Sequence, residues 1–444
     1  MQIVKSNEVG KNAVLKLLKK PAFDEVVLSP KIREANKKLF GEDLSPSALV
    51  RKIVSDVREK GDEALFHYTK LFDKTDITAK DLIVTEDEIK AAEDSADKDV
   101  VESLKRAAKN IEAFHEEQKP KSWISYRAHG SILGQAVIPL DRVGIYVPGG
   151  TAAYPSSVLM NAIPAKVAGV KEIIMTVPPK EGKINPYVLI AARLAGVTKI
   201  YKAGGAQAIA ALAFGTETIP KVDKITGPGN LFVTLAKKEV YGHVDIDMLA
   251  GPSEILILAD DTADPILTAA DMLSQAEHDP LASSILITTC ETLAENVKTE
   301  AEKQVKELPR CAIASASLEK NGLIVIAENL EEAIEFANES APEHMEILTK
   351  SPFEVLPKIR HAGAIFLGAY SPEPLGDYFA GPNHVLPTGG TARYYSVLNV
   401  ETFLKRSSVI SYTAEALKEV GEDIIRLAKS EGLDAHANAV KLRR

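Results

Sequence analysis

Cysteine is nearly absent from the chain, and its scarcity removes several classes of protein. Only Cys290 and Cys311 occur among 444 residues, which excludes a disulfide framework and any zinc site built from four cysteines. Cys290 ends an apolar, strand-like run, so we expect a buried structural thiol there rather than a nucleophile. Long apolar runs are lacking too. The one after Tyr154 is interrupted by Asn161 and Lys166, and none reaches the roughly 18 residues that cross a bilayer.

Concentrated positive charge is the next absence. The formal net charge is -9 and no long block of Lys and Arg interrupts it, so we expect neither nucleic acid nor a membrane as partner. The first residues scatter lysines among apolar side chains, unlike a secretory signal, and we expect a cytoplasmic protein. The apolar fraction of 45% is typical of a globular chain, and the length predicts two to four structural units.

A repeat of short apolar runs, each closed by Gly or Pro and followed by a helical pattern, is what the chain has in abundance. This order is typical of consecutive βα units of a parallel sheet. The predicted strands of the repeat are 143–147, 172–177, 199–203, 222–226 and 244–248. A second α/β pattern runs from 255 to 367, and residues 123–140 alternate as an antiparallel ribbon would. The charged helical pattern of 85–119 indicates scaffold, with His115 as surface or core filler.

Glycine-rich loops follow three of these runs, at 149–155, 204–210 and 227–232. None matches the G-x-G-x-x-G dinucleotide fingerprint, and no P-loop lysine follows any of them. One such loop is more often a tight turn than a phosphate cradle. Because the carboxyl ends of parallel strands meet at one edge, three loops in register favour a nucleotide site there.

Gln275 and His278 are three residues apart in a helical pattern from about 264 to 279, so one helix face presents both side chains. Such a pair suits a hydrogen-bonded polar face and also two ligands of a metal ion. Asp377 and His384, in a loop-rich stretch from 368 to 395, are further donors, although Asp377 also suits an Asx-turn. Zinc fits nitrogen and oxygen ligands of this kind, with manganese or iron as competitors.

Glu343 and His344 are adjacent and suit two interpretations. They serve as base and proton shuttle if both point into a site, or as a solvated Glu beside a capping His. His436 lies at the start of the last helical pattern, where a surface histidine is also expected. The residues alone therefore indicate an α/β protein with a nucleotide-binding edge and a nitrogen/oxygen metal site, and they leave the substrate open.

Taken together, the motifs resemble those of the histidinol dehydrogenase family. The matching segments are IYVPGG (145–150), GGAQAIAALAFGTE (204–217), KITGPGN (224–230), DIDMLAGPSE (245–254), MLSQAEHDP (272–280), APEH (341–344), AGAIFLG (362–368), SPEPLGDYFAGPNHVLPT (371–388) and EGLDAHANAVKLR (431–443). They occur in the family's order over essentially the whole chain, which makes the resemblance far more specific than any one motif.

The resemblance implies a zinc-dependent enzyme that oxidises L-histidinol to L-histidine through L-histidinaldehyde, using two NAD+, in the last steps of histidine biosynthesis. It implies that Gln275, His278 and Asp377 are zinc ligands of one subunit. His436 matches the fourth ligand, which in the family comes from the partner subunit of an intertwined homodimer with shared active sites.

The resemblance also implies the catalytic and binding roles. His344 would accept the hydroxyl proton as the first hydride leaves, and Glu343 would activate water to hydrate the aldehyde. The implied substrate contacts are Ser253, Gln275, His278, His344, Asp377, Glu431 and His436. The implied NAD contacts, all on or beside the glycine-rich loops, are Tyr146, Gln207 and Asn230.

The fold class that follows is α/β, with two Rossmann-like α/β domains that carry incomplete dinucleotide-binding motifs and a small helical dimerisation tail. We expect 1–33 to be an N-terminal helical segment packed with the C-terminal region. Residues 34–144 and 253–398 would form the α/β domain with most of the metal and catalytic site. Residues 145–252 would form the Rossmann-like domain with the NAD loops, and 399–444 the helical tail that contributes to the partner's site.

Alternative functions differ in what they require of the same residues. A related zinc- and NAD-dependent alcohol dehydrogenase, acting on another polar alcohol such as a sulfonated propanediol, would share the zinc site, although Ser253 and Glu431 favour histidinol. A zinc hydrolase would need no nucleotide, and the row of glycine-rich loops opposes it. A non-catalytic dimer held together by metal would not need Glu343 and His344.

Overall fold

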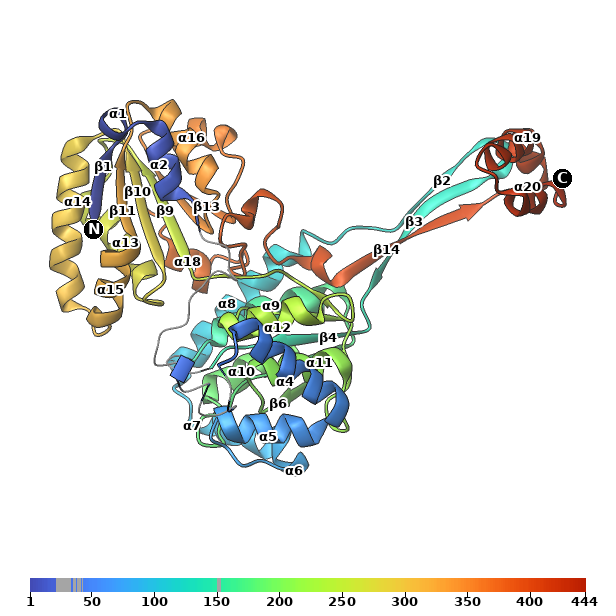
Figure 1. Ribbon diagram of the computed structural model, residues 1–444, viewed down its shortest axis with the longest axis horizontal. Helices are drawn as coiled ribbons and strands as arrows, with labels where there is room; N and C mark the ends of the chain where they lie inside the picture. Colours follow the sequence, from blue (N-terminus) through green and yellow to red (C-terminus); the bar gives the residue numbers. More distant parts are fainter. Residues whose placement is uncertain (21–32, 35–36, 38–40, 42, 150–152) are drawn as a thin grey trace.

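The computed structural model describes residues 1–20, 33–34, 37, 41, 43–149 and 153–444. These residues form two α/β lobes and a long arm that ends in a pair of helices (Figure 1). The predicted α/β class with parallel sheets is confirmed. Residues 21–32 of the predicted segment 1–33, and residues 150–152 of the glycine-rich loop at 149–155, lie outside the described residues.

The first lobe contains a parallel sheet of five described strands in the order β6-β5-β4-β7-β8. Its strands are β4 (Arg142–Tyr146), β5 (Glu172–Thr176), β6 (Lys199–Tyr201), β7 (Lys224–Thr226) and β8 (Asp245–Ile246). The helices that alternate with them are α9 (Pro155–Ala168), α10 (Pro186–Ala195), α11 (Gly205–Phe214) and α12 (Leu231–Val240). The predicted βα repeat is confirmed strand by strand, because strands covered on both faces leave continuous apolar runs in the sequence.

Helices from the earlier part of the chain cover this same sheet. They are α4 (Pro46–Lys60), α5 (Asp62–Phe72), α6 (Ala79–Leu82), α7 (Glu86–Ser95) and α8 (Lys98–Glu116). Helix α4 packs against α11 and α12, and α8 packs against α9 and α10, so these helices share the hydrophobic cores of the first lobe. The prediction that joined 34–144 to 253–398 is therefore wrong for these helices. An amphipathic helix displays an apolar stripe in its sequence, but the stripe does not say which sheet it covers.

The second lobe contains a parallel sheet of six described strands in the order β1-β11-β10-β9-β12-β13. Its strands are β1 (Gln2–Lys5), β9 (Glu254–Ala259), β10 (Ser283–Thr288), β11 (Gly322–Ile326), β12 (His344–Leu348) and β13 (Ala364–Leu367). Its helices are α1 (Ser6–Val9), α2 (Lys11–Leu18), α13 (Pro265–Ala276), α14 (Glu291–Gln304), α15 (Cys311–Asn321), α16 (Leu330–Ser340), α17 (Pro352–Val355) and α18 (Glu373–Tyr378).

The N-terminal segment contains the helices α1 and α2, as the helical prediction expects, but differs from it at residues 2–5. Residues 2–5 form the edge strand β1, which pairs in parallel with β11, and the hydroxyl of Ser6 donates to Glu332 of α16 at 2.7 Å. The described part of 1–33 therefore belongs to the second lobe rather than to the C-terminal tail. Four residues are too few to reveal a strand by their periodicity.

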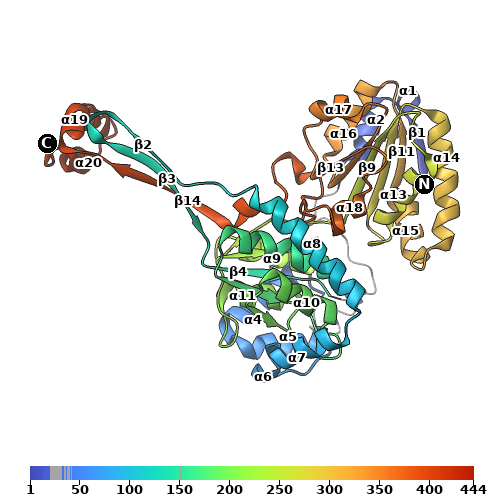
Figure 2. The same ribbon diagram turned by 180° about the vertical axis from the view of Figure 1, so that it is seen from behind.

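The arm is an antiparallel ribbon of β2 (Trp123–Tyr126), β3 (Ile132–Pro139) and β14 (Leu404–Ser411), with β3 in the middle. The ribbon predicted for 123–140 is confirmed, whereas the helical tail predicted for 399–444 is wrong at 404–411, which form β14. This strand is mostly polar and exposed, so it shows no apolar run. Helices α19 (Ala414–Ser430) and α20 (Asp434–Lys441) lie at the far end of the arm, away from both lobes (Figures 1 and 2).

Some described segments carry apolar side chains that the chain itself does not cover. On the arm these include Trp123, Tyr126 and Ile410, whose exposed fractions are 52%, 73% and 72%.

No helix among the described residues is long and apolar enough to cross a membrane.

Candidate metal and cofactor sites

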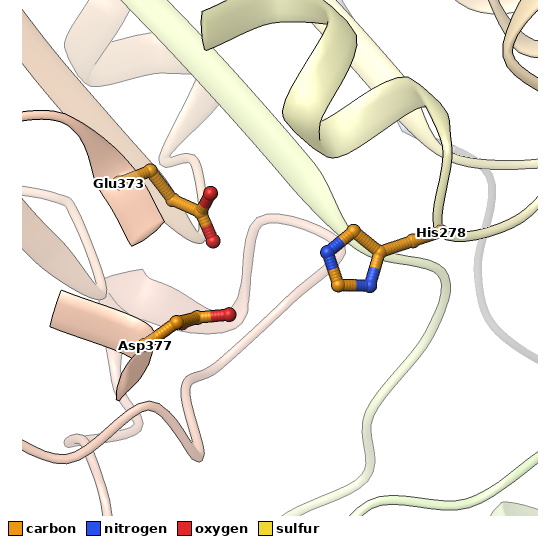
Figure 3. Close-up of side chains that lie close together, drawn as sticks. All are labelled: His278, Glu373 and Asp377. Atoms are coloured by element: carbon orange, nitrogen blue, oxygen red, sulfur yellow. The ribbon is translucent and has the colours of Figure 1, made fainter. Parts of the chain in front are cut away.

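A cluster of possible metal ligands lies in the second lobe, where α13 ends and α18 begins. The cluster consists of His278, Glu373 and Asp377. Each residue offers one possible ligand atom, and these three atoms lie within 4.8 Å of one another. Figure 3 shows the imidazole of His278 facing both carboxylates. Asp264 caps the start of α13, since its carboxylate accepts from the N–H of Ile266 at 2.7 Å, and the helix ends at Ala276. His278 therefore lies in the turn that directly follows the helix.

Gln275, in the last turn of α13, has a side-chain oxygen that could serve as a further metal ligand. Its side chain is 1% exposed, and its Oε1 has no hydrogen-bond partner among the described residues. A buried amide oxygen without a partner is costly, so it marks a place where another group binds. Imidazole nitrogen, carboxylate oxygen and amide oxygen together suit zinc, and the donors present therefore fit the predicted metal.

His344 is the first residue of β12, and its two ring nitrogens have different surroundings. Nδ1 lies 3.0 Å from the carbonyl oxygen of Glu254, a geometry in which Nδ1–H donates. Nε2 is buried without a hydrogen-bond partner, 3.8 Å from a carboxylate oxygen of Glu373 and 3.8 Å from one of Asp377. The neutral ring therefore presents a lone pair towards the cluster, which is the form that accepts a proton.

Glu343 is tied to the same backbone residue. The N–H of Glu254 donates to Glu343 Oε2 at 2.8 Å, so Glu254 holds both members of the predicted catalytic pair through its peptide groups. Burial raises the pKa of Glu343 to about 8. For His344, burial favours the neutral ring, but the carboxylates of Glu343, Asp377 and Glu373 outweigh it and raise its pKa to about 10.

Two further buried acids, Glu346 and Glu373, lie at the candidate site, and no motif in the sequence marks them. Glu346, on the same face of β12 as His344, accepts from the N–H of Glu373 at 2.8 Å and so caps α18. Ser274 donates to the Glu373 carboxylate at 3.1 Å. Burial, followed by the charge of Asp377, raises the pKa of Glu373 to about 8. The spacing of Glu373 and Asp377, four residues apart, was the signal that could have found Glu373.

His384, the alternative ligand, lies behind Asp377 rather than among the ligand atoms. Its Nδ1 is 3.1 Å from the carbonyl oxygen of Asp377, and its Nε2 is 3.3 Å from the hydroxyl of Ser157 on α9. Burial lowers the pKa of His384, which favours the neutral ring. It is thus placed to hold the backbone of α18 against the first lobe.

A separate cavity of about 590 Å³ lies at the carboxyl edge of the first lobe's sheet. The predicted NAD contacts Tyr146, Gln207 and Asn230 all line it. The Tyr146 hydroxyl accepts from the N–H of Gly205 at 3.2 Å, and both polar atoms of the Gln207 amide are buried without partners among the described residues. Asp73 also lines the cavity, and burial raises its pKa to about 6. No motif in the sequence marks Asp73.

Comparison with known proteins decides the family. The model of the family described as histidinol dehydrogenase matches residues 41–444. The chain belongs to the histidinol dehydrogenase family. This is a family of oxidoreductases, as the resemblance predicted.

Relatives within the histidinol dehydrogenase family are similar over almost their full length. The histidinol dehydrogenase of Bacillus thuringiensis subsp. konkukian is 55% identical over 421 residues, which cover 95% of this chain and 97% of that protein. That of Heliobacterium mobile is 56% identical over 403 residues, covering 90% and 94%. The crystal structure of histidinol dehydrogenase from Elizabethkingia anophelis superposes with a TM-score of 0.90 at 39% identity, covering 100% of this chain and 98% of that one.

Not all the positions matched to the histidinol dehydrogenase family meet within one chain. Ser253 directly precedes β9 beside Glu254, and its carbonyl accepts from the N–H of Ser283 at 3.0 Å. Glu431 and His436 are exposed at the far end of the arm, where α19 ends and in α20, away from α13 and α18 (Figures 1 and 2). A single chain therefore brings together only part of the predicted site.

Proposed function

We propose that the chain catalyses the zinc-dependent, NAD-linked four-electron oxidation of L-histidinol to L-histidine through L-histidinaldehyde, the last steps of histidine biosynthesis in the cytoplasm. Relatives at about 55% identity carry the name histidinol dehydrogenase. The observation that carries most weight is the orientation of His344. Its Nδ1 donates to the carbonyl of Glu254, and its Nε2, which has no hydrogen-bond partner among the described residues, faces the carboxylates of Glu373 and Asp377 in the candidate metal cluster.

The residues that would hold zinc are Gln275, His278 and Asp377, with His436 of a second copy as the fourth ligand. Their support is the grouping of the His278 and Asp377 ligand atoms, together with the buried Oε1 of Gln275, which lies three residues before His278 in the chain and has no partner among the described residues. When bound, zinc would orient the imidazole and amine nitrogens of histidinol and offset the negative charge of the carboxylates. With that charge offset, the carboxylates would hold a proton on His344 less strongly, and its Nε2 would be available as a base.

The first oxidation needs one base and one hydride acceptor. Nε2 of His344 takes the proton of the substrate hydroxyl. At the same time a hydride passes from the carbon that bears this hydroxyl to NAD+, which gives the aldehyde and NADH. The bond from Nδ1 to Glu254 keeps the ring in the tautomer that this step requires.

The second oxidation begins with water. Glu343 takes a proton from a water molecule as its oxygen adds to the aldehyde carbon, giving the hydrate. A second hydride then passes from that carbon to another NAD+, and proton loss leaves the carboxylate. The raised pKa of Glu343 suits a base that works near neutral pH, since it binds a proton more readily than an exposed carboxylate.

The cavity of the first lobe would bind NAD+ for both steps. Tyr146, Gln207 and Asn230 lie on its wall, and the two unpartnered atoms of the Gln207 amide offer a donor and an acceptor to the dinucleotide. The glycine-rich loops bring backbone N–H groups to the same edge of the sheet.

The arm supports a homodimer with shared active sites. Glu431 and His436 would reach the site of a second copy, because their own chain holds them far from α13 (Figure 1). The exposed apolar side chains of Trp123, Tyr126 and Ile410 are of the kind that an interface between copies covers.

The yield of NADH per histidinol consumed tests the proposal. Two NADH per histidinol, with histidine as the product, is the expected result. One NADH would indicate a simple alcohol dehydrogenase. Activity with a sulfonated propanediol and none with histidinol would assign the chain to the sister activity.

A further inference from the structure

Gly227 follows β7 at the edge of the cofactor cavity, pressed against the backbone of Tyr146. Its φ is +112°, and a Cβ at this position would lie 2.1 Å from the carbonyl oxygen of Tyr146. Only glycine fits such a contact. The turn from Gly227 to Gly229 then leads directly to Asn230, which lines the cavity.

One buried ion pair binds both peptide groups of Gly227. Its N–H donates to Asp247 Oδ2 at 2.7 Å, and its carbonyl oxygen accepts from Lys237 Nζ at 3.0 Å. Lys237 also donates to the Asp247 carboxylate, which closes a ring of three residues. The side chains of Lys237 and Asp247 are only 3% and 1% exposed.

Stability alone does not account for a pair buried this deeply. Removing two charges from water is costly, and replacing such a pair by apolar residues of similar size is often neutral or stabilising. Other contacts already tie α12 to the segment after β8, since Thr234 donates to the carbonyl of Ala250 at 2.9 Å. Gly227 follows the last paired residue of β7, so its N–H and C=O need other partners. Apolar side chains cannot supply those hydrogen bonds.

We propose that Lys237 and Asp247 are positioning residues for NAD+ binding. They hold the Gly227 peptide groups and thereby place the turn and Asn230 on the cavity wall. The inference rests on the proposed function, because that function puts NAD+ in this cavity.

The geometry shows how a shift of Gly227 reaches the cavity. Asn230 Oδ1 accepts from the N–H groups of Phe232 and Val233 at 3.0 and 3.2 Å, so the start of α12 orients the Asn230 side chain. A Cβ on Gly229 would lie 2.3 Å from Val233, which shows how closely the turn packs on this helix. Loosening the turn would therefore move Asn230 and Phe232, which both line the cavity.

The test uses the full-length double variant Lys237→Met/Asp247→Leu, which approximates the shape of both side chains and buries no unpaired charge. We expect a folded protein whose KM for NAD+ rises at least about tenfold, with kcat and the KM for histidinol within about threefold of wild type. If the ion pair were merely structural, a folded double variant would keep the wild-type KM for NAD+.

Thr234→Val is the matched control, because it removes a buried bond of the same helix without touching Gly227. It should lower the melting temperature slightly and leave the KM for NAD+ unchanged. If the double variant does not fold, Asp247→Asn replaces it. Its amide cannot both accept from Gly227 and pair with the Lys237 charge, so the KM for NAD+ should again rise.

A KM for NAD+ within about twofold of wild type, in either folded variant, would overturn the inference while leaving the proposed function intact. Calorimetric titration of the wild-type protein with NAD+ separates the two failures. Absence of NAD+ binding there would overturn the proposed cofactor site and, with it, this inference.

Discussion

Nδ1 of His344 lies 3.0 Å from the carbonyl oxygen of Glu254, at the start of the neighbouring strand β9. Because this bond uses the only ring proton of a neutral imidazole, the other nitrogen is left as an acceptor. Parallel pairing of β12 with β9 thus sets the chemistry of one side chain. The same pairing brings the N–H of Glu254 to Glu343, so the two residues depend on one strand register.

Replacement of His344 by Asn removes the acceptor nitrogen and keeps a side chain able to donate to Glu254. We expect kcat for histidinol to fall by about 10²- to 10⁴-fold, the usual contribution of a general base. The melting temperature should change little. The exposed His67 provides the control, since His67→Asn should retain full activity in the same NADH assay. Comparable activity of both variants would remove His344 from the mechanism.

Replacement of Glu343 by Gln separates the two oxidations. The amide oxygen can still accept from Glu254, but the side chain can no longer take a proton from water. The first hydride transfer should survive, so NADH yield should fall towards one per histidinol and a carbonyl trap should capture the aldehyde. A variant that still yields two NADH at the wild-type rate would show that another group activates the water.

Zinc retention should depend on ligands from both copies of the chain, His278 of one copy and His436 of the other. His278→Asn and His436→Asn should each abolish zinc retention after gel filtration, because zinc binds few ligands and each one matters. His67→Asn should retain the metal and serves as the control. Elemental analysis measures the outcome, and a full equivalent of zinc in either ligand variant would refute the ligand set.

Mixing two inactive variants tests whether the site is shared between copies. A His436→Asn chain supplies an intact core site, and a Gln275→Ala chain supplies an intact His436. Random exchange would leave one complete site in each hybrid dimer and restore about one quarter of wild-type activity. Mass spectrometry verifies that exchange has occurred. No recovery after verified exchange would show that each site is built from a single chain.

The stability of the fold should depend on pH through His115. This histidine is fully buried, its Nδ1 donates to the Ile111 carbonyl at 2.7 Å, and its Nε2 faces the Asn383 amide nitrogen at 3.4 Å. Burial lowers its pKa below the ordinary 6.5. The unfolded chain therefore binds more protons below pH 6.5, and the free energy of unfolding should fall as pH decreases through that range.

Urea unfolding above and below pH 6.5 measures this effect, with His115→Gln as the comparison. The variant should have a smaller loss of stability at acid pH, because it has no imidazole to protonate. Equal losses in the two proteins would assign the acid sensitivity to other groups.

The sequence predicts the scaffold best where strands are covered on both faces. The runs at 143–147 and 172–177 are continuous because α/β packing buries every side chain. Strand β12 shows no continuous apolar run in the sequence, because His344 and Glu346 are polar residues on the same face of the strand, where the candidate site lies. Strand β14 shows no such run for a different reason, since the arm is exposed.

The candidate site was predictable only in part from residue spacing. Gln275 and His278 suggest a shared face and Asp377 a possible oxygen ligand, but the family resemblance, rather than spacing, joined Asp377 and His436 to them as one ligand set. Glu373 was within reach of a search for acids four residues apart. The pair Lys237 and Asp247 was not, because two distant residues meet around a glycine only through the tertiary fold.

The pairing of β14 with β3 has a consequence for synthesis of the chain. Leu404 lies opposite Pro139 and Ser411 opposite Ile132, so the two strands leave the ribosome far apart in time. Until β14 appears, one edge of β3 is an open row of N–H and C=O groups that any extended segment can pair with. Nascent and truncated chains are thus open to wrong pairing along the arm, and a chaperone that shields this edge would protect them until translation ends.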